Sequence, residues 1–173
     1  MNDLPLHPVL VHLPIGLAVL LPPALLILLV AIRRNLLPRG SWWLAVLLAA
    51  ALLGGGYAAK QSGGNEEDKV EAVVPEAAIH EHEESGERLV IAAGVTFILV
   101  LAAAFVRRPG LRLGIQTAAL LASAATLAIA VNAGHLGGRL VYVHGAARAY
   151  VTTPAPPPAE PPAGALHESP DRD

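Results

Sequence analysis

The chain has 173 residues, of which 54% are apolar and only 15% are charged, and its mean hydropathy is +0.52. This composition is typical of a protein whose solvent is a lipid bilayer, and it excludes an ordinary water-soluble domain. The formal net charge of -2 offers no basic face for nucleic acid, and the lack of cysteine excludes disulfides, thiolate metal sites, iron–sulfur clusters and covalently attached c-type haem.

Four apolar stretches are long enough to cross the hydrocarbon core, which takes about 20 residues in a helix. The predicted spans are residues 9–32, 42–59, 89–106 and 113–133. The segment before the first span holds Asp3 and no basic residue, so it lacks the positive region of a cleaved signal peptide and we expect the first span to be retained. Long runs rich in Leu and Ala exclude a closed barrel, which leaves an all-α integral membrane protein in contact with the lipid bilayer.

The connections between the spans differ in charge. Two short connections carry six arginines and no acidic residue, whereas the long middle connection, residues 60–88, is rich in Glu and Asp. The arginines are Arg33, Arg34, Arg39, Arg107, Arg108 and Arg112. The positive-inside rule places these loops in the cytoplasm and both termini outside, in a bacterial inner (cytoplasmic) membrane. Short turns pair the first span with the second and the third with the fourth, which predicts an up-down four-helix bundle over residues 1–150.

Prolines mark the first span and the C-terminal tail. Pro14, Pro22 and Pro23 lie inside the first span and predict a kinked helix that opens a cavity near its outer end. Residues 151–173 are rich in Pro and Ala and cannot build a packed core, so we expect a disordered tail.

The histidines are segregated to one side of the predicted membrane. All seven fall on the outer side, and none lies in an arginine-rich connection. They are His7 and His12 at the start of the first span, His80 and His82 before the third, His135 and His144 after the fourth, and His167 in the tail. Neutral imidazole is a common ligand of haem iron, copper and zinc, and three separate segments bring it to one depth. The pattern therefore predicts a cofactor site at the outer face.

Local geometry selects three of these histidines. His12 lies about one turn inside a helix that begins near Pro8. His80 and His82 are two residues apart and cannot face the same way on a helix, so we favour His82 as the inward one. Glycines after the fourth span, Gly134, Gly137 and Gly138, predict a sharp turn that returns His144 across the mouth of the bundle. The predicted cofactor ligands are His12, His82 and His144, and the wider set of metal candidates adds His7 and His135.

Ordinary structural roles compete with these assignments. A histidine at a membrane interface is often a polar rim residue, and His7, which precedes the predicted helix, is equally suited to be a cap. Arg139 has two interpretations: it reaches lipid phosphate, or it pairs with an acidic side chain or a haem propionate at the same rim. The acidic residues of the middle connection keep it soluble or weakly collect a divalent cation.

Three motifs carry a family resemblance. They are LHPVLVHLPIG (6–16), HEESGER (82–88) and GHLGGRLVYVHG (134–145). Over about residues 4–148 the chain resembles a family of small bacterial membrane proteins known as domain of unknown function 2231, whose layout is similar to that of four-helix transmembrane b-type cytochromes. The resemblance implies a four-span bundle that binds haem through His12, His82 or His144. Di-haem membrane cytochromes place histidines at both depths, whereas this chain has them at one, so a single outer haem or metal is expected.

These observations favour a non-catalytic redox module. We expect it to bind haem b or a transition metal at its outer face and to pass electrons to a periplasmic or membrane partner or to quinone; a homo-oligomer is compatible with this. The alternative is a cofactor-free structural or accessory membrane protein with hydrogen-bonded or pH-sensing rim histidines. A transporter ranks lowest because no predicted span holds an Asp, Glu, Lys or Arg side chain. A hydrolytic enzyme has no support, since no serine elbow, HExxH spacing or phosphate loop is present.

Overall fold

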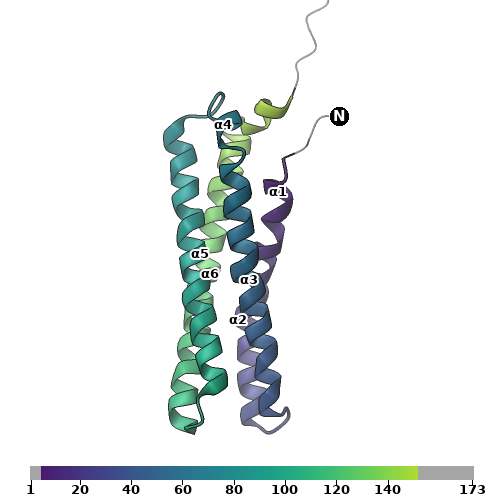
Figure 1. Ribbon diagram of the computed structural model, residues 1–173, viewed down its shortest axis with the longest axis vertical. Coiled ribbons are helices and arrows are strands. Elements are labelled where there is room, and N and C mark those ends of the chain that lie inside the picture. The colour runs from purple at the N-terminus through teal and green to yellow at the C-terminus, as the bar shows by residue number, and fades with distance from the viewer. Residues whose placement is uncertain (1–4, 152–173) are drawn as a thin grey trace, which may run out of the picture.

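Four long helices lie side by side along one axis (Figure 1). The computed structural model describes residues 5–151, and all regular elements within that range are helical. The long helices are α2 (His12–Arg33), α3 (Trp42–Gly64), α5 (Glu76–Phe105) and α6 (Pro109–Tyr142). Consecutive long helices pack on one another, and α2 also packs on α6, which closes the bundle. All four are long and apolar enough to span a membrane, so the predicted all-α four-helix up-down membrane bundle is confirmed.

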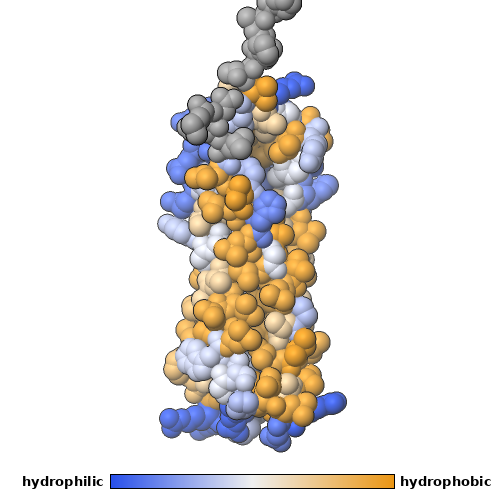
Figure 2. Space-filling model, turned by 90° about the vertical axis from the view of Figure 1, so that its right-hand side faces the viewer, coloured by the Kyte–Doolittle hydropathy of each residue, from blue (hydrophilic) through white to orange (hydrophobic). Residues whose placement is uncertain are grey.

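The two ends of the bundle differ in chemistry. The turns α2–α3 and α5–α6 carry the six arginines, and we call this the arginine end. The opposite end bears the start of the described chain, the α3–α5 connection and the segment after α6; because the histidines at positions 7 to 144 belong to it, we call it the histidine end. Figure 2 shows a belt of hydrophobic side chains between two hydrophilic ends, as a bilayer requires.

Four short elements complete the fold. They are α1 (His7–Leu10), η1 (Arg39–Ser41), α4 (Glu67–Val70) and η2 (Ala146–Tyr150). The helical hydrogen-bonding pattern is interrupted at Val11, between α1 and α2, while the backbone of Val11 stays in the right-handed helical region. Because Pro14 has no N–H, the carbonyl of Leu10 cannot receive its helical hydrogen bond, which explains the break at this position. Helix α2 then continues without interruption through Pro22 and Pro23.

The helices are longer than the predicted spans. Helix α5 begins at Glu76, inside the connection that we expected to be a loop, and α6 continues to Tyr142. At about 1.5 Å per residue α6 is about 50 Å long, well beyond a hydrocarbon core of about 30 Å. The predicted sharp turn after residue 133 is wrong, because all three glycines lie inside α6. The chain turns instead at Gly145, whose φ of +75° is readily adopted by glycine.

Small residues fill the centre of the bundle and large ones face outward. Leu21, Leu25 and Val100 are at most 1% exposed, and most of the remaining core consists of alanine. By contrast, Leu47 and Ile98 are about two-thirds exposed. In lipid there is no hydrophobic gain from hiding such side chains, so helix association depends on the close approach that small residues permit.

Polar contacts between helices fix how the bundle packs. Thr96 of α5 and Thr126 of α6 are fully buried, and their hydroxyl oxygens lie 2.9 Å apart. The indole Nε1 of Trp42 on α3 donates to the carbonyl of Val100 on α5 over 2.9 Å. Each of these groups would be costly to bury without a partner, so both contacts specify the pairing of the helices that carry them.

Candidate metal site at the histidine end

Two imidazoles from separate parts of the sequence meet at the histidine end. His7 of α1 and His82 of α5 lie with their ring centres 6.0 Å apart and their planes at 83°. The two residues are also at nearly the same height above the arginine end: at about 1.5 Å per helical residue, His7 is about 39 Å from Arg33 and His82 about 35 Å from Phe105. Helix lengths therefore bring the rings together.

The His7 ring is oriented by helix α3. Its Nδ1 lies 2.9 Å from the carbonyl oxygen of Ala59 and 3.1 Å from the hydroxyl of Ser62. A carbonyl only accepts, so Nδ1 carries the proton; the Ser62 hydroxyl itself donates to the same carbonyl over 2.8 Å. In the neutral imidazole the lone pair therefore resides on Nε2. A backbone carbonyl that fixes the tautomer in this way is the usual companion of a metal-binding histidine.

The His82 ring has a nitrogen without a partner. Its Nδ1 is buried and makes no hydrogen bond to the residues that the structure describes. A buried polar atom without a partner costs about 1–3 kcal/mol, so its place in the fold calls for an explanation.

Two glycines make room for these rings. A Cβ at Gly63 would lie 3.2 Å from Cε1 of His7, and one at Gly137 would lie 3.0 Å from Cε1 of His82. Because both contacts are this close, a larger residue at either glycine would push the neighbouring imidazole from its position. The glycine that we expected to redirect the chain after the fourth span instead lets α6 approach the ring of His82.

The other predicted ligands lie elsewhere. Within residues 5–151 no three histidine or carboxylate side chains are arranged to hold one metal ion, so the structure does not assemble His12, His82 and His144 into a site. The side chain of His12, at the start of α2, is exposed. Because α6 stays helical, His144 lies seven residues beyond Gly137, roughly 10 Å further along the axis. His135 on α6 is also exposed.

The inward choice between His80 and His82 agrees with the structure. The side chain of His80 is exposed, whereas that of His82 is half-buried against α6. Of the two interpretations of Arg139, the structure favours the acidic partner, since one of its guanidinium nitrogens lies 3.9 Å from a carboxylate oxygen of Glu81. Both side chains are about half exposed, so this ion pair contributes little stability.

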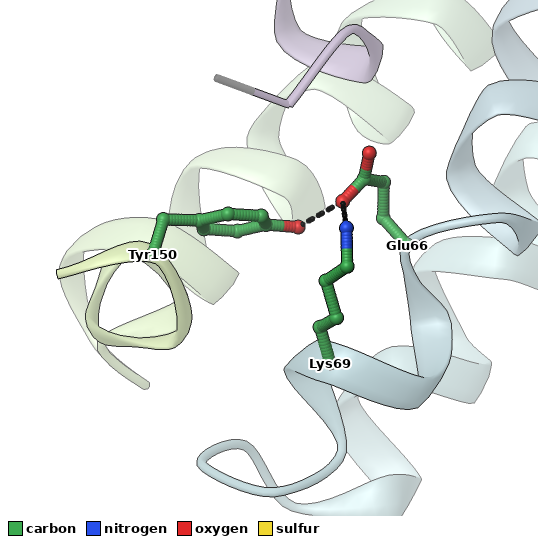
Figure 3. Close-up of polar contacts among 3 residues, drawn as sticks. All are labelled: Glu66, Lys69 and Tyr150. Carbon is green, nitrogen blue, oxygen red and sulfur yellow. Dashed lines mark hydrogen bonds and ion pairs between the residues drawn. The ribbon is translucent and has the colours of Figure 1, made fainter. Parts of the chain in front are cut away.

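Three polar residues, Glu66, Lys69 and Tyr150, join η2 to the connection after α3, and we call them the polar clasp (Figure 3). The Tyr150 hydroxyl donates to a carboxylate oxygen of Glu66 over 2.7 Å, and the Lys69 ammonium lies 3.3 Å from the same oxygen. The hydrogen bond from Tyr150, assisted by Lys69 and by the nearby His7, holds the pKa of Glu66 below its ordinary value. Burial, together with the Glu66 carboxylate, raises the pKa of Tyr150 to about 12.

The match to known families spans the whole bundle. Residues 3–149 match the family described as predicted membrane protein (DUF2231). The chain belongs to the DUF2231 family. No curated protein and no solved structure shows a significant match to it. The resemblance expected from the three sequence motifs is therefore confirmed.

Two of the DUF2231 motifs contain the residues that meet in space. The first motif supplies His7, which sequence reasoning placed only in the wider set of candidates, and the second supplies His82. The third supplies Gly137, whose role as a contact surface was not foreseen. The contacts of His7 with Ser62 and the Ala59 carbonyl were also missed. The only signal in the sequence was the Ser-Gly-Gly run that follows an apolar stretch, and it does not indicate which histidine would pack against it.

Proposed function

We propose that this DUF2231 protein is a membrane redox module that binds one transition-metal ion through His7 and His82. The observation that carries the proposal is the arrangement of ring nitrogens. Nδ1 of His7 is held by the backbone carbonyl of Ala59 on α3, while Nε2 of His7 and Nδ1 of His82 have no hydrogen-bond partner among the described residues. This is the pattern of two neutral imidazoles prepared to donate lone pairs.

The separation of the rings fits a shared metal. A metal–imidazole bond of about 2.0 Å places the ring centre roughly 3 Å from the metal, so two imidazoles on one ion have centres roughly 5–6 Å apart. The observed separation is 6.0 Å. Two histidines leave the remaining coordination positions of such an ion to water or to another molecule.

A single ion fits these residues better than haem b does. A pair of imidazoles on one ion needs only the space that the rings already occupy, whereas haem also needs a flat slot between the helices. The two hollows described in the next subsection lie at the arginine end, away from both histidines. Haem held by the same pair would be the second form of the proposal, because the 6.0 Å ring separation would also allow both imidazoles to hold one haem iron.

The remaining residues would orient the ligands. When bound, copper, which suits imidazole ligands, would supply one-electron chemistry. The Ala59 carbonyl and Ser62 hold His7 in one tautomer, and Gly137 lets α6 fix the position of the His82 ring. We further propose that this end faces the periplasm of a bacterial inner membrane, since the opposite end carries the arginines. A periplasmic or membrane partner, or quinone, would then exchange electrons there.

Metal analysis of the purified protein tests the proposal. Protein extracted in a mild detergent, stripped with EDTA and titrated with Cu(II) or Zn(II), should bind about one ion per chain. Replacing His7 or His82 with Gln should weaken binding at least tenfold. The matched controls are His12→Gln and His135→Gln, which remove exposed imidazoles from the same end.

Each outcome of this experiment is informative. A Soret band in the untreated protein that is lost in the His82→Gln variant would identify haem as the group that is held. Equal losses in the variants and the controls would show weak surface binding and refute the site. If the wild-type protein binds neither metal nor haem, and the His7→Gln and His82→Gln variants are only less stable, the histidine pair is a structural joint and the cofactor-free alternative holds.

A further inference from the structure

A polar cavity lies at the arginine end, remote from the histidine pair. It consists of two adjoining hollows of about 300 and about 850 Å³ between the α2–α3 and α5–α6 turns. The two hollows share four lining residues, which are Ile32, Arg39, Arg112 and Gln116. The cavity therefore brings together side chains from three elements, α2, η1 and α6, that are distant in sequence.

Gln116 is the unusual member of this lining. Its side chain is only 6% exposed, it borders both hollows, and none of the side-chain hydrogen bonds within residues 5–151 involves it. Its amide nitrogen and oxygen are not among the sealed polar atoms that lack a partner, so they open on the cavity and are available to a ligand. It lies four residues after Arg112 on α6, so the two side chains share one face of the helix. An amide N–H and a guanidinium are thus presented together to the cavity.

The cavity has an excess of positive charge. The ion pairs among the described residues all involve other cations, namely Lys60, Lys69, Arg88 and Arg139. Arg39 and Arg112 therefore have no carboxylate partner in the part of the chain that the structure describes. The first N–H groups of α6, which begins at Pro109, also belong to this end and add the positive pole of the helix dipole. An anion bound here would satisfy all of these groups.

The position of the cavity indicates which anion is available. The smaller hollow is also lined by Trp43 and Phe105, whose rings are 5.7 Å apart and whose side chains are 52% and 67% exposed. Exposed tryptophan at the end of a spanning helix lies at headgroup depth in a bilayer. The cavity consequently opens where lipid phosphates lie, and arginine forms paired hydrogen bonds with phosphate oxygens.

We propose that this cavity binds the phosphate of an anionic phospholipid, with Arg39 and Arg112 as charge partners and Gln116 as the buried hydrogen-bond donor. The acyl chains would then follow the apolar surface beside Trp43 and Phe105. This site is independent of the metal site, because it uses other residues at the opposite end of the bundle.

Native mass spectrometry with matched variants tests this site. Protein in a neutral detergent is mixed with phosphatidylglycerol or with phosphatidylcholine of the same chain length, and bound lipid is counted. The variant Arg39→Gln/Arg112→Gln should bind phosphatidylglycerol at least tenfold more weakly than the wild type. The control Arg34→Gln/Arg108→Gln removes the same charge from arginines that do not line the cavity, and it should bind as the wild type does.

A second variant separates a built site from general charge. Gln116→Leu leaves every arginine in place and should also weaken phosphatidylglycerol binding, while circular dichroism and the elution volume verify folding. Equal losses in the two arginine double variants would show diffuse electrostatics and overturn the proposal, as would equal binding of phosphatidylcholine. If millimolar inorganic phosphate displaces the bound phosphatidylglycerol, the ligand is a free phosphate and the lipid assignment is wrong.

Discussion

The hydrogen bond between Thr96 and Thr126 provides a test of how the two C-terminal helices associate. The Thr126 hydroxyl donates to the carbonyl of Ala122 over 2.9 Å. Its oxygen is therefore an acceptor for the Thr96 hydroxyl, which lies 2.9 Å away. Because the proton of Thr126 is already used within its own helix, the two threonines are not equivalent.

Valine at each position removes one hydroxyl with little change of shape, and the two changes should differ in cost. Thr96→Val leaves the Thr126 hydroxyl bound to its own helix, and we expect a loss of about 0.5 kcal/mol in the free energy of unfolding. Thr126→Val leaves the Thr96 hydroxyl buried without its acceptor. That costs about 1–2 kcal/mol, since rotation toward the carbonyl of Ala92 recovers only part of the bond. The coupling energy from the double variant should be about 0.6–1.7 kcal/mol.

The assay is reversible unfolding in bicelles by titration with SDS, followed by circular dichroism. Thr117→Val, an exposed position on the same helix, is the control for the chemistry of the substitution and should have little effect. A coupling energy of zero would show that the hydroxyls do not interact. A larger loss for Thr96→Val than for Thr126→Val would refute the assignment of donor and acceptor.

Three further predictions concern the histidine end. Gly137→Ala should destabilise the protein by about 1–3 kcal/mol in the same unfolding assay, because the new methyl group would lie 3.0 Å from the His82 ring. The control is Gly138→Ala, whose methyl group would have no neighbour within 4 Å, and it should be neutral or stabilising. Because the pKa of Glu66 is lowered by folding, its carboxylate stabilises the protein fully above the unfolded-state pKa of about 4.3, and this stabilisation is lost as the pH falls through the lower folded-state pKa. Tyr150→Phe removes the hydrogen bond to Glu66 and should weaken the acid dependence of the free energy of unfolding. An unchanged dependence in this variant would contradict the clasp. At alkaline pH the raised pKa of Tyr150 contributes stability that is full below about pH 10 and is lost as the pH rises toward 12. In a pH titration followed by tyrosinate absorbance, one tyrosine should therefore ionise only near pH 12, and this step should be missing in Tyr150→Phe.

The sequence alone determined the architecture of the bundle. Apolar runs of about 20 residues have only one stable form in lipid, so the four helices and their order followed from length and hydropathy. The arginine turns, whose charges cannot enter the hydrocarbon, fixed which connections share an end. Both predictions rest on interactions between the chain and its solvent, which each segment makes without reference to the others.

Hydropathy did not locate the ends of the helices. The regions around residues 76–88 and 134–142 are too polar for lipid and were expected to be loop, yet both are helical. Outside the hydrocarbon, water and neighbouring helices replace lipid, and polarity no longer limits a helix. The extension of α6 moved His144 away from the predicted site.

The candidate site was only partly visible in the sequence. The gathering of histidines at one end, and the inward position of His82, could be read from spacing. Which imidazole meets it, His7 rather than His12 or His144, depended on the packing of α1 against α3 and on the length of α6. The cavity lined by Gln116 likewise arises only where three helical elements converge. Such contacts depend on the relative positions of helices to within a few ångströms. Only the packed tertiary structure decides these positions, because no single segment of the sequence specifies where its neighbours lie.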